Sequence, residues 1–158
     1  MKCLVAMLLF STWVVFLGYS VIAPFFPPQL DARGLSSLYN SVVFAVYAIT
    51  YVAISIVNGK IIIPRCGRSV AFFIGAVCQL IALGLLISLE YIPNNIVFIA
   101  MAVVARLLQG AGSTVMVSLS YGIVSLAYPD NLNVLHTLLQ MAITLGLAIS
   151  PFAGRFFY

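Results

Sequence analysis

Five long apolar stretches follow one another along the chain, and the short connections between them contain all of its acidic residues. The stretches cover residues 4–24, 38–57, 70–89, 96–128 and 132–158. Because about 20 largely apolar residues suffice for a helix to cross a bilayer, each stretch is long enough to span a membrane. The pattern predicts an all-α membrane protein with five transmembrane helices in one domain, residues 1–158.

The composition supports a membrane protein and argues against nucleic-acid binding. Of the 158 residues, 64% are hydrophobic and 6% are charged, whereas soluble domains are about 25% charged. The formal net charge is +4, but the seven lysines and arginines are scattered along the chain. Binding to a phosphate backbone requires a clustered basic surface. We therefore expect a lipid bilayer as the surroundings of this chain and no nucleic-acid partner.

Residues suited to catalysis or metal binding are few. Cys3, Cys66 and Cys78 stand far apart without a paired-cysteine motif, and the chain has a single histidine. All three acidic residues fall in connections between the apolar stretches, so no pair of positioned acid–base groups is evident. The sequence predicts no enzyme activity, no metal site and no cofactor.

The distribution of basic residues predicts how the chain is oriented in the membrane. Lysine and arginine favour the cytosolic side of membrane proteins. Four basic residues fall at the amino terminus and in the second connection, against two on the other side: Lys2, Lys60, Arg65 and Arg68, against Arg33 and Arg155. We expect a multi-pass protein of the plasma membrane or an intracellular vesicle membrane, with its amino terminus in the cytosol.

Polar residues on the second helix, residues 38–57, share one face with Asn58, just beyond its end. They recur at intervals of seven, four, four and three positions: Asn40, Tyr47, Tyr51, Ser55 and Asn58. Two interpretations stand side by side, namely packing against neighbouring helices and the lining of a transport path. By contrast, the third helix has few polar residues, chiefly Gln79 and Ser88. We expect it to lie at the periphery, in contact with lipid.

Arg106 is the one charge deep inside an apolar stretch, ten positions beyond Ile96. A charge near the bilayer centre is costly, so its side chain should face the helix bundle and have partners there. Gly110 and Ser113 follow on the same helix face. We interpret these residues as part of a transport path. The alternative is a structural role in which Arg106 only donates hydrogen bonds to carbonyl groups or a helix end.

The fifth helix carries a ridge of small residues at four-residue spacing: Ala142, Gly146, Ser150 and Gly154. Such a ridge lets another helix backbone approach closely. Pro151 removes one backbone donor and is expected to bend the helix. Packing explains these residues first, and a hinge in a conformational change is compatible with it.

Three motifs in the expected order resemble the amino-terminal half of a major facilitator superfamily transporter. The connection from Gly59 to Arg68 resembles the family's cytosolic loop signature, which implies gating roles for Arg65, Gly67 and Arg68. Arg106-Leu107-Leu108-Gln109-Gly110-Ala111-Gly112 is similar to an Arg-x-x-Gln-Gly-x-Gly motif implicated in proton coupling. Gly146 to Gly154, including Ser150-Pro151, resembles an antiporter signature.

The first helix resembles the vesicular amine and polyamine transporter branch through Ser20-Val21-Ile22-Ala23-Pro24-Phe25-Phe26-Pro27. The resemblance implies secondary active transport by proton antiport, with protons and a small organic solute, most simply a cation such as a polyamine or amine, as partners. Family members have two six-helix halves. Five helices would form an incomplete transmembrane domain, one partial half, which needs a missing second half or another transporter chain. The alternative is a non-transporting membrane protein that associates with transporter halves and regulates them.

Overall fold

The protein is a bundle of five long helices. A computed structural model describes the backbone of residues 2–156 and the side chains of residues 3–149. The long helices are α1 (Lys2–Ala32), α2 (Leu38–Val57), α4 (Arg68–Ser88), α5 (Asn95–Ala127) and α6 (Leu132–Phe156). Short helical segments join them: η1 (Asn58–Ile62, π-helical), α3 (Ile63–Cys66), η2 (Leu89–Tyr91) and η3 (Pro129–Asn131). Within residues 2–156 there is no strand, which confirms the all-α prediction.

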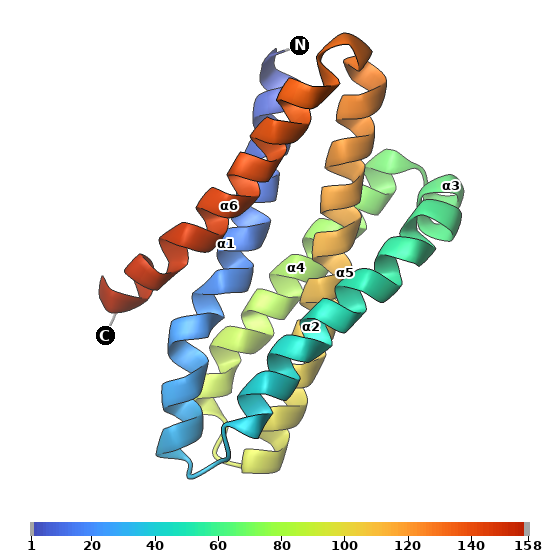
Figure 1. Cartoon of the computed structure of the whole chain (residues 1–158). Coiled ribbons are helices and arrows are strands. Elements are labelled where there is room, and N and C mark those ends of the chain that lie inside the picture. The colour runs from blue at the N-terminus through green and yellow to red at the C-terminus, as the bar shows by residue number, and fades with distance from the viewer. Residues whose placement is uncertain (1, 157–158) are drawn as a thin grey trace.

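The long helices alternate in direction, as Figure 1 shows. The amino terminus, the α2–α4 connection and the α5–α6 connection lie at one end of the bundle, and the α1–α2 and α4–α5 connections lie at the other. Helix α5 is central, because it packs against α4, α2 and α1, while α6 packs mainly along α1. Alternation of this kind places successive connections on opposite sides of a membrane.

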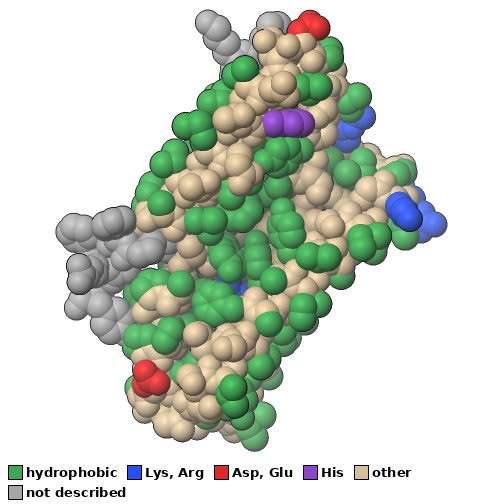
Figure 2. Space-filling view, in the orientation of Figure 1, with side chains coloured by type: hydrophobic (Ala, Val, Ile, Leu, Met, Phe, Trp, Pro, Cys, Tyr) green, Lys and Arg blue, Asp and Glu red, His purple; other side chains and the backbone are tan. Residues whose placement is uncertain are grey.

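Five helices within the described residues are long and apolar enough to cross a membrane. On the face shown in Figure 2, the exposed charged side chains gather near the ends of the bundle, with hydrophobic side chains between them. Exposed apolar residues at seven-residue spacing mark one outer face of α4: Phe73, Leu80 and Ile87. A surface of this kind is stable in lipid and not in water. The protein is therefore an integral, multi-pass membrane protein.

Helix α1 is longer than the apolar stretch predicted. It continues beyond residue 24 through Pro24, Pro27 and Pro28 and ends at Ala32. In membrane helices prolines are tolerated, because neighbouring groups compensate for the lost backbone donors. The actual stop is a Schellman motif, in which Leu35 N donates to Leu30 O and Gly34 N to Asp31 O. Gly34 has φ +65°, which favours glycine.

Glycines set the spacing of the central helices. A β-carbon at Gly110 would lie 2.9 Å from Tyr47 O on α2, and one at Gly112 would lie 2.6 Å from Gly75 O on α4. Both distances are too short for any other residue without backbone movement. Hence two glycines of α5 allow α2 and α4 to approach it on different sides.

Candidate functional site around Arg106

Arg106 lies fully buried in α5, with 0% of its side chain exposed. Its Nη1 donates to Gln109 Oε1 at 2.6 Å, one turn further along the same helix. The same nitrogen donates to the backbone carbonyl of Tyr19 on α1 at 3.3 Å. Arg106 therefore faces the interior of the bundle and links α5 to α1.

Three aromatic rings surround the guanidinium, and we call them the aromatic box. The Cζ atom of Arg106 lies 4.6 Å from the ring centre of Phe44, 5.0 Å from that of Tyr19 and 5.8 Å from that of Tyr47. The Tyr19 and Tyr47 rings are themselves in contact, with centroids 4.2 Å apart. Because ring faces carry partial negative charge, the box offsets part of the cost of burying a cation.

Two nitrogens of the guanidinium have no hydrogen-bond partner among the described residues. Both of them, Arg106 Nε and Nη2, are buried. No carboxylate in residues 3–149 forms an ion pair with this side chain. Buried donors of a charged group rarely stay unsatisfied, since the loss of hydration is expensive. Nε and Nη2 can therefore still donate to an acceptor from outside the described residues.

A chain of amide and hydroxyl groups extends the site along α1. Gln109 Nε2 donates to Gly18 O at 3.1 Å, and Gln79 Nε2 on α4 donates to Val15 O at 3.4 Å. Ser113 on α5 donates to Gln79 Oε1 at 3.3 Å. The two acceptors on α1 are helix carbonyls using their second lone pair. Two sets of polar contacts, one through Gln109 and one through Gln79, thus join α5 and α4 to successive turns of α1 inside an apolar bundle.

The tyrosines of α2 border this network. The Tyr47 ring is buried, and its hydroxyl lies beside Ser113 without a hydrogen-bond partner of good geometry. Tyr51 is half-buried, with its ring 6.1 Å from that of Tyr47, and its backbone carbonyl accepts from Thr114 Oγ1 at 3.0 Å. Of the predicted polar stripe, Ser55 is exposed. It bonds only its own helix, to Val52 O.

The structure brings most of the predicted path residues together, and Gly110 is the exception. Arg106, Gln109, Ser113 and Tyr47 lie around one polar centre. Gly110, by contrast, faces the α2 backbone and serves close packing. The transport roles of these residues remain predictions.

The predicted gating residues of the loop lie elsewhere. Arg65 and Arg68 are exposed, at the end of α3 and the start of α4. Gly67 between them has φ +77°, a conformation that favours glycine and turns the chain from α3 into α4. These residues are at the same end of the bundle as the amino terminus (Figure 1). Their gating role remains a prediction.

The small-residue ridge of α6 faces α1. A β-carbon at Gly146 would lie 2.8 Å from Trp13 O, and Ser20 Oγ on α1 donates to Gly146 O at 3.0 Å. Ala142 is buried as well. The packing interpretation therefore accounts for this half of the ridge. Ser150, Pro151 and Gly154 lie outside the residues whose side chains are described.

Three residues of the site were missed by sequence reasoning. Tyr19 and Phe44 gave no signal, because aromatic residues are equally common on lipid-facing surfaces. Gln79 did give a signal, as a lone amide in an apolar helix. The outer face of α4 is exposed as expected of a peripheral helix, but Gln79 is on the opposite face and buried.

Five long apolar helices around a buried, hydrogen-bonded arginine are the features of a multi-pass membrane protein with a polar site inside its helix bundle. The chain matches the Major Facilitator Superfamily over residues 8–158 and belongs to that family. The finding confirms the family that the three motifs indicated.

Named relatives are similar over most of the chain. It is 28% identical over 140 residues to the MFS-type transporter SLC18B1 of Mus musculus and of Rattus norvegicus, and 27% identical to that of Homo sapiens. In each case the alignment covers 89% of this chain and 30% of the relative. The chain therefore spans about 30% of the length of these curated relatives. No solved structure matches it significantly.

Proposed function

We propose that this chain supplies amino-terminal helices of a secondary active transporter that exchanges protons for a small organic cation, such as a polyamine or amine. The observation that carries the proposal is Arg106, the one charged side chain that is buried among the described residues. Ionisable groups inside membrane bundles mark solute and ion pathways. The relatives are named transporters, which is consistent with this role.

The aromatic box supports a cationic solute. Rings of Tyr19, Phe44 and Tyr47 already hold one cation, the guanidinium of Arg106. A solute ammonium that approaches the same rings competes with Arg106 for them and is repelled by its charge. Solute binding and the position of Arg106 would therefore be coupled.

Alternating access requires more than these helices. In transporters built from repeats, the solute site lies at the midplane between two bundles that rock against each other. The two unpartnered nitrogens of Arg106 are consistent with a site completed from outside the described residues. A missing second half, or another transporter chain, would supply the facing wall. We place the complex in the plasma membrane or an intracellular vesicle membrane.

Uptake by proteoliposomes tests the proposal. The chain, extended by any coding sequence that follows Tyr158 or combined with a chain that provides the second half, should accumulate labelled spermidine or a labelled monoamine when a proton gradient is imposed. The chain alone should show no saturable uptake above empty vesicles. Absence of gradient-dependent uptake by the completed protein would refute the proposed transport. Saturable uptake by the chain alone would refute the requirement for a second half.

The regulatory alternative rests on a free ridge on α6. Within the described residues, Ala142 and Gly146 are buried, and Gly146 packs on the backbone of α1. That part of the ridge is therefore already occupied within the chain. This observation favours the transporter over a protein that binds transporter halves through α6.

A further inference from the structure

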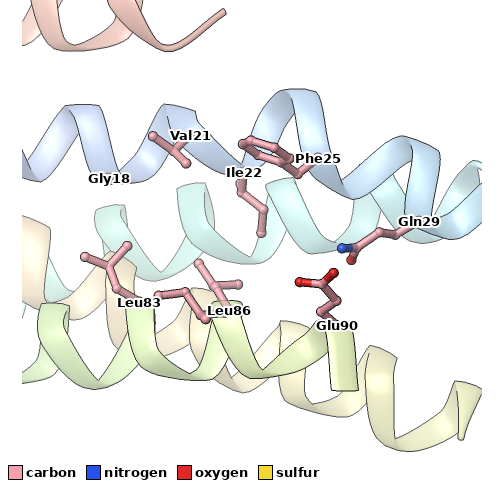
Figure 3. Close-up of a pocket in the computed structure, with 9 residues that line it drawn as sticks. Gly18, Val21, Ile22, Phe25, Gln29, Leu83, Leu86 and Glu90 are labelled. Carbon is pink, nitrogen blue, oxygen red and sulfur yellow. The ribbon is translucent and has the colours of Figure 1, made fainter. Parts of the chain in front are cut away.

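A pocket separate from the aromatic box lies between α1 and α4. Its volume is about 330 Å³, and Figure 3 shows most of its walls. The lining comprises Gly18, Val21, Ile22, Phe25 and Gln29 of α1 with Leu83, Leu86, Ile87 and Glu90 from α4 and η2. A cavity of this size suits a small organic molecule.

The pocket is polar at one end only. The side chains of Gln29 and Glu90 point toward one another there, and the remaining side chains are apolar (Figure 3). Glu90 provides the one formal charge of the lining, and it is exposed. Arg33, a basic residue four positions after Gln29 in the sequence, contacts another group, since its Cζ lies 4.2 Å from the ring centre of Phe98. The carboxylate of Glu90 is therefore available to a ligand.

We propose that this pocket binds amphiphilic organic monocations, that is, a single ammonium group on an apolar body. The ammonium would pair with the Glu90 carboxylate and the amide oxygen of Gln29, and the apolar body would lie against Ile22, Leu83 and Leu86. Charge complementarity excludes carboxylates and phospholipid phosphates, which Glu90 repels. A polyamine is also disfavoured, because its further charges would be desolvated along the apolar wall.

The inner end of the pocket adjoins the Arg106 network. Gly18 lines the pocket, and its carbonyl oxygen accepts from Gln109, the partner of Arg106. A bound ligand would touch the turn of α1 that anchors the network. The pocket would thus serve as an access site for monoamines, one of the two kinds of solute proposed above. This last step rests on the proposed function, whereas binding to the pocket does not.

Binding to the chain in phosphatidylcholine nanodiscs tests the inference without any transport assay. Calorimetry would compare n-octylamine, protonated at neutral pH, with n-octanol, octanoate and spermidine, after subtraction of empty nanodiscs. We expect saturable binding of octylamine and weaker binding of the other three. Glu90→Gln should weaken octylamine binding about tenfold at low ionic strength and leave octanol unchanged. Asp31→Asn removes an acid in the last turn of α1 that does not line the pocket, and it should change the affinity less than about twofold.

A pair of tryptophan variants tests the location. Ile87 and Leu80 are both on α4 and 70% and 69% exposed, but only Ile87 lines the pocket. Neither change disturbs the core, so both proteins should fold. Ile87→Trp should abolish octylamine binding by filling the groove, and Leu80→Trp should retain it.

Three results would overturn the inference. Equal binding of octanol and octylamine, with neither affected by Glu90→Gln, would show that the pocket binds only through apolar contacts. Loss of binding in Leu80→Trp as in Ile87→Trp would place the ligand elsewhere. Elimination of octylamine binding by phosphatidylethanolamine in the nanodisc would identify a lipid headgroup as the occupant. If proton-driven uptake failed while octylamine still bound as expected, the proposed transport would be refuted and the inferred ligand site would stand.

Discussion

Arg106 on α5 makes two different contacts with Tyr19 on α1. Its Nη1 donates to the Tyr19 carbonyl oxygen at 3.3 Å, and its Cζ lies 5.0 Å from the centre of the Tyr19 ring. The first contact survives any side-chain substitution of Tyr19, whereas the second depends on the ring. The two contributions can therefore be separated by mutation.

Tyr19→Leu should destabilise the bundle, because it removes a ring that contacts both Arg106 and the ring of Tyr47. Loss of one buried cation–π contact costs about 1–2 kcal/mol, and Tyr19→Phe should retain most of it. Thermal unfolding in detergent measures both variants. In a double-mutant cycle with Arg106→Gln, the two effects should be non-additive by at least about 0.5 kcal/mol. Full additivity would show that the ring does not interact with Arg106.

Arg106→Lys should lose most of the transport rate of the completed protein. Lysine keeps the charge but lacks the planar set of five donors, in which Nη1 binds Tyr19 O and Gln109 Oε1 while Nε and Nη2 remain for a further acceptor. Arg106→Gln removes the charge and should abolish uptake. Uptake is measured per correctly inserted protein. Well-inserted variants of both kinds with undiminished uptake would restrict Arg106 to a structural role.

Gly112→Ala should lower the stability of the bundle. The new β-carbon would lie 2.6 Å from Gly75 O, a backbone atom that moves only with its helix. Overpacking of this kind costs about 1–3 kcal/mol. Gly122→Ala is the matched control on the same helix, since nothing lies within 4 Å of its β-carbon position. That variant should be neutral or slightly stabilising in the same unfolding measurement. Equal effects would contradict the close contact of α4 and α5.

Cysteine labelling tests the proposed orientation. Native Cys66 is exposed and lies next to Gly67 in the connection that we expect to be cytosolic. Arg33 belongs to the α1–α2 connection, which lies at the opposite end of the bundle (Figure 1). A membrane-impermeant reagent applied outside right-side-out vesicles should modify Arg33→Cys and spare Cys66. The reverse pattern would place the amino terminus outside.

Helix ends show where local sequence rules gave way to the surroundings. The apolar stretch predicts a first helix that ends at residue 24, and in water the lost donor and ring clash of Pro24, Pro27 and Pro28 disfavour a helix interior. In the structure the helix continues to Ala32 and stops at a motif centred on Gly34. By contrast, Asn94 behaves as a local signal should, with Oδ1 accepting from Ile96 N and Val97 N at the start of α5.

Five helices long and apolar enough to cross a membrane, and an inward-facing Arg106, could be predicted without the structure. Both follow from solvation, which is a property of each segment: apolar stretches partition into lipid, and a charge within one must find protein partners. Family motifs added the position of Gln109 and the glycines that follow it. These inferences required no knowledge of which helices are neighbours.

Only the tertiary structure decided which groups meet Arg106. Tyr19 and Phe44 come from different helices and look like lipid-facing residues in the sequence, and Gln79 on α4 reaches the neighbouring turn of α1 and Ser113. The same holds for Glu90, which the sequence places in a connection and which lines a pocket together with Gln29 in the structure. The physical reason is that such partnerships depend on the distance and rotation between helices, which the contacts at Gly110 and Gly112 set.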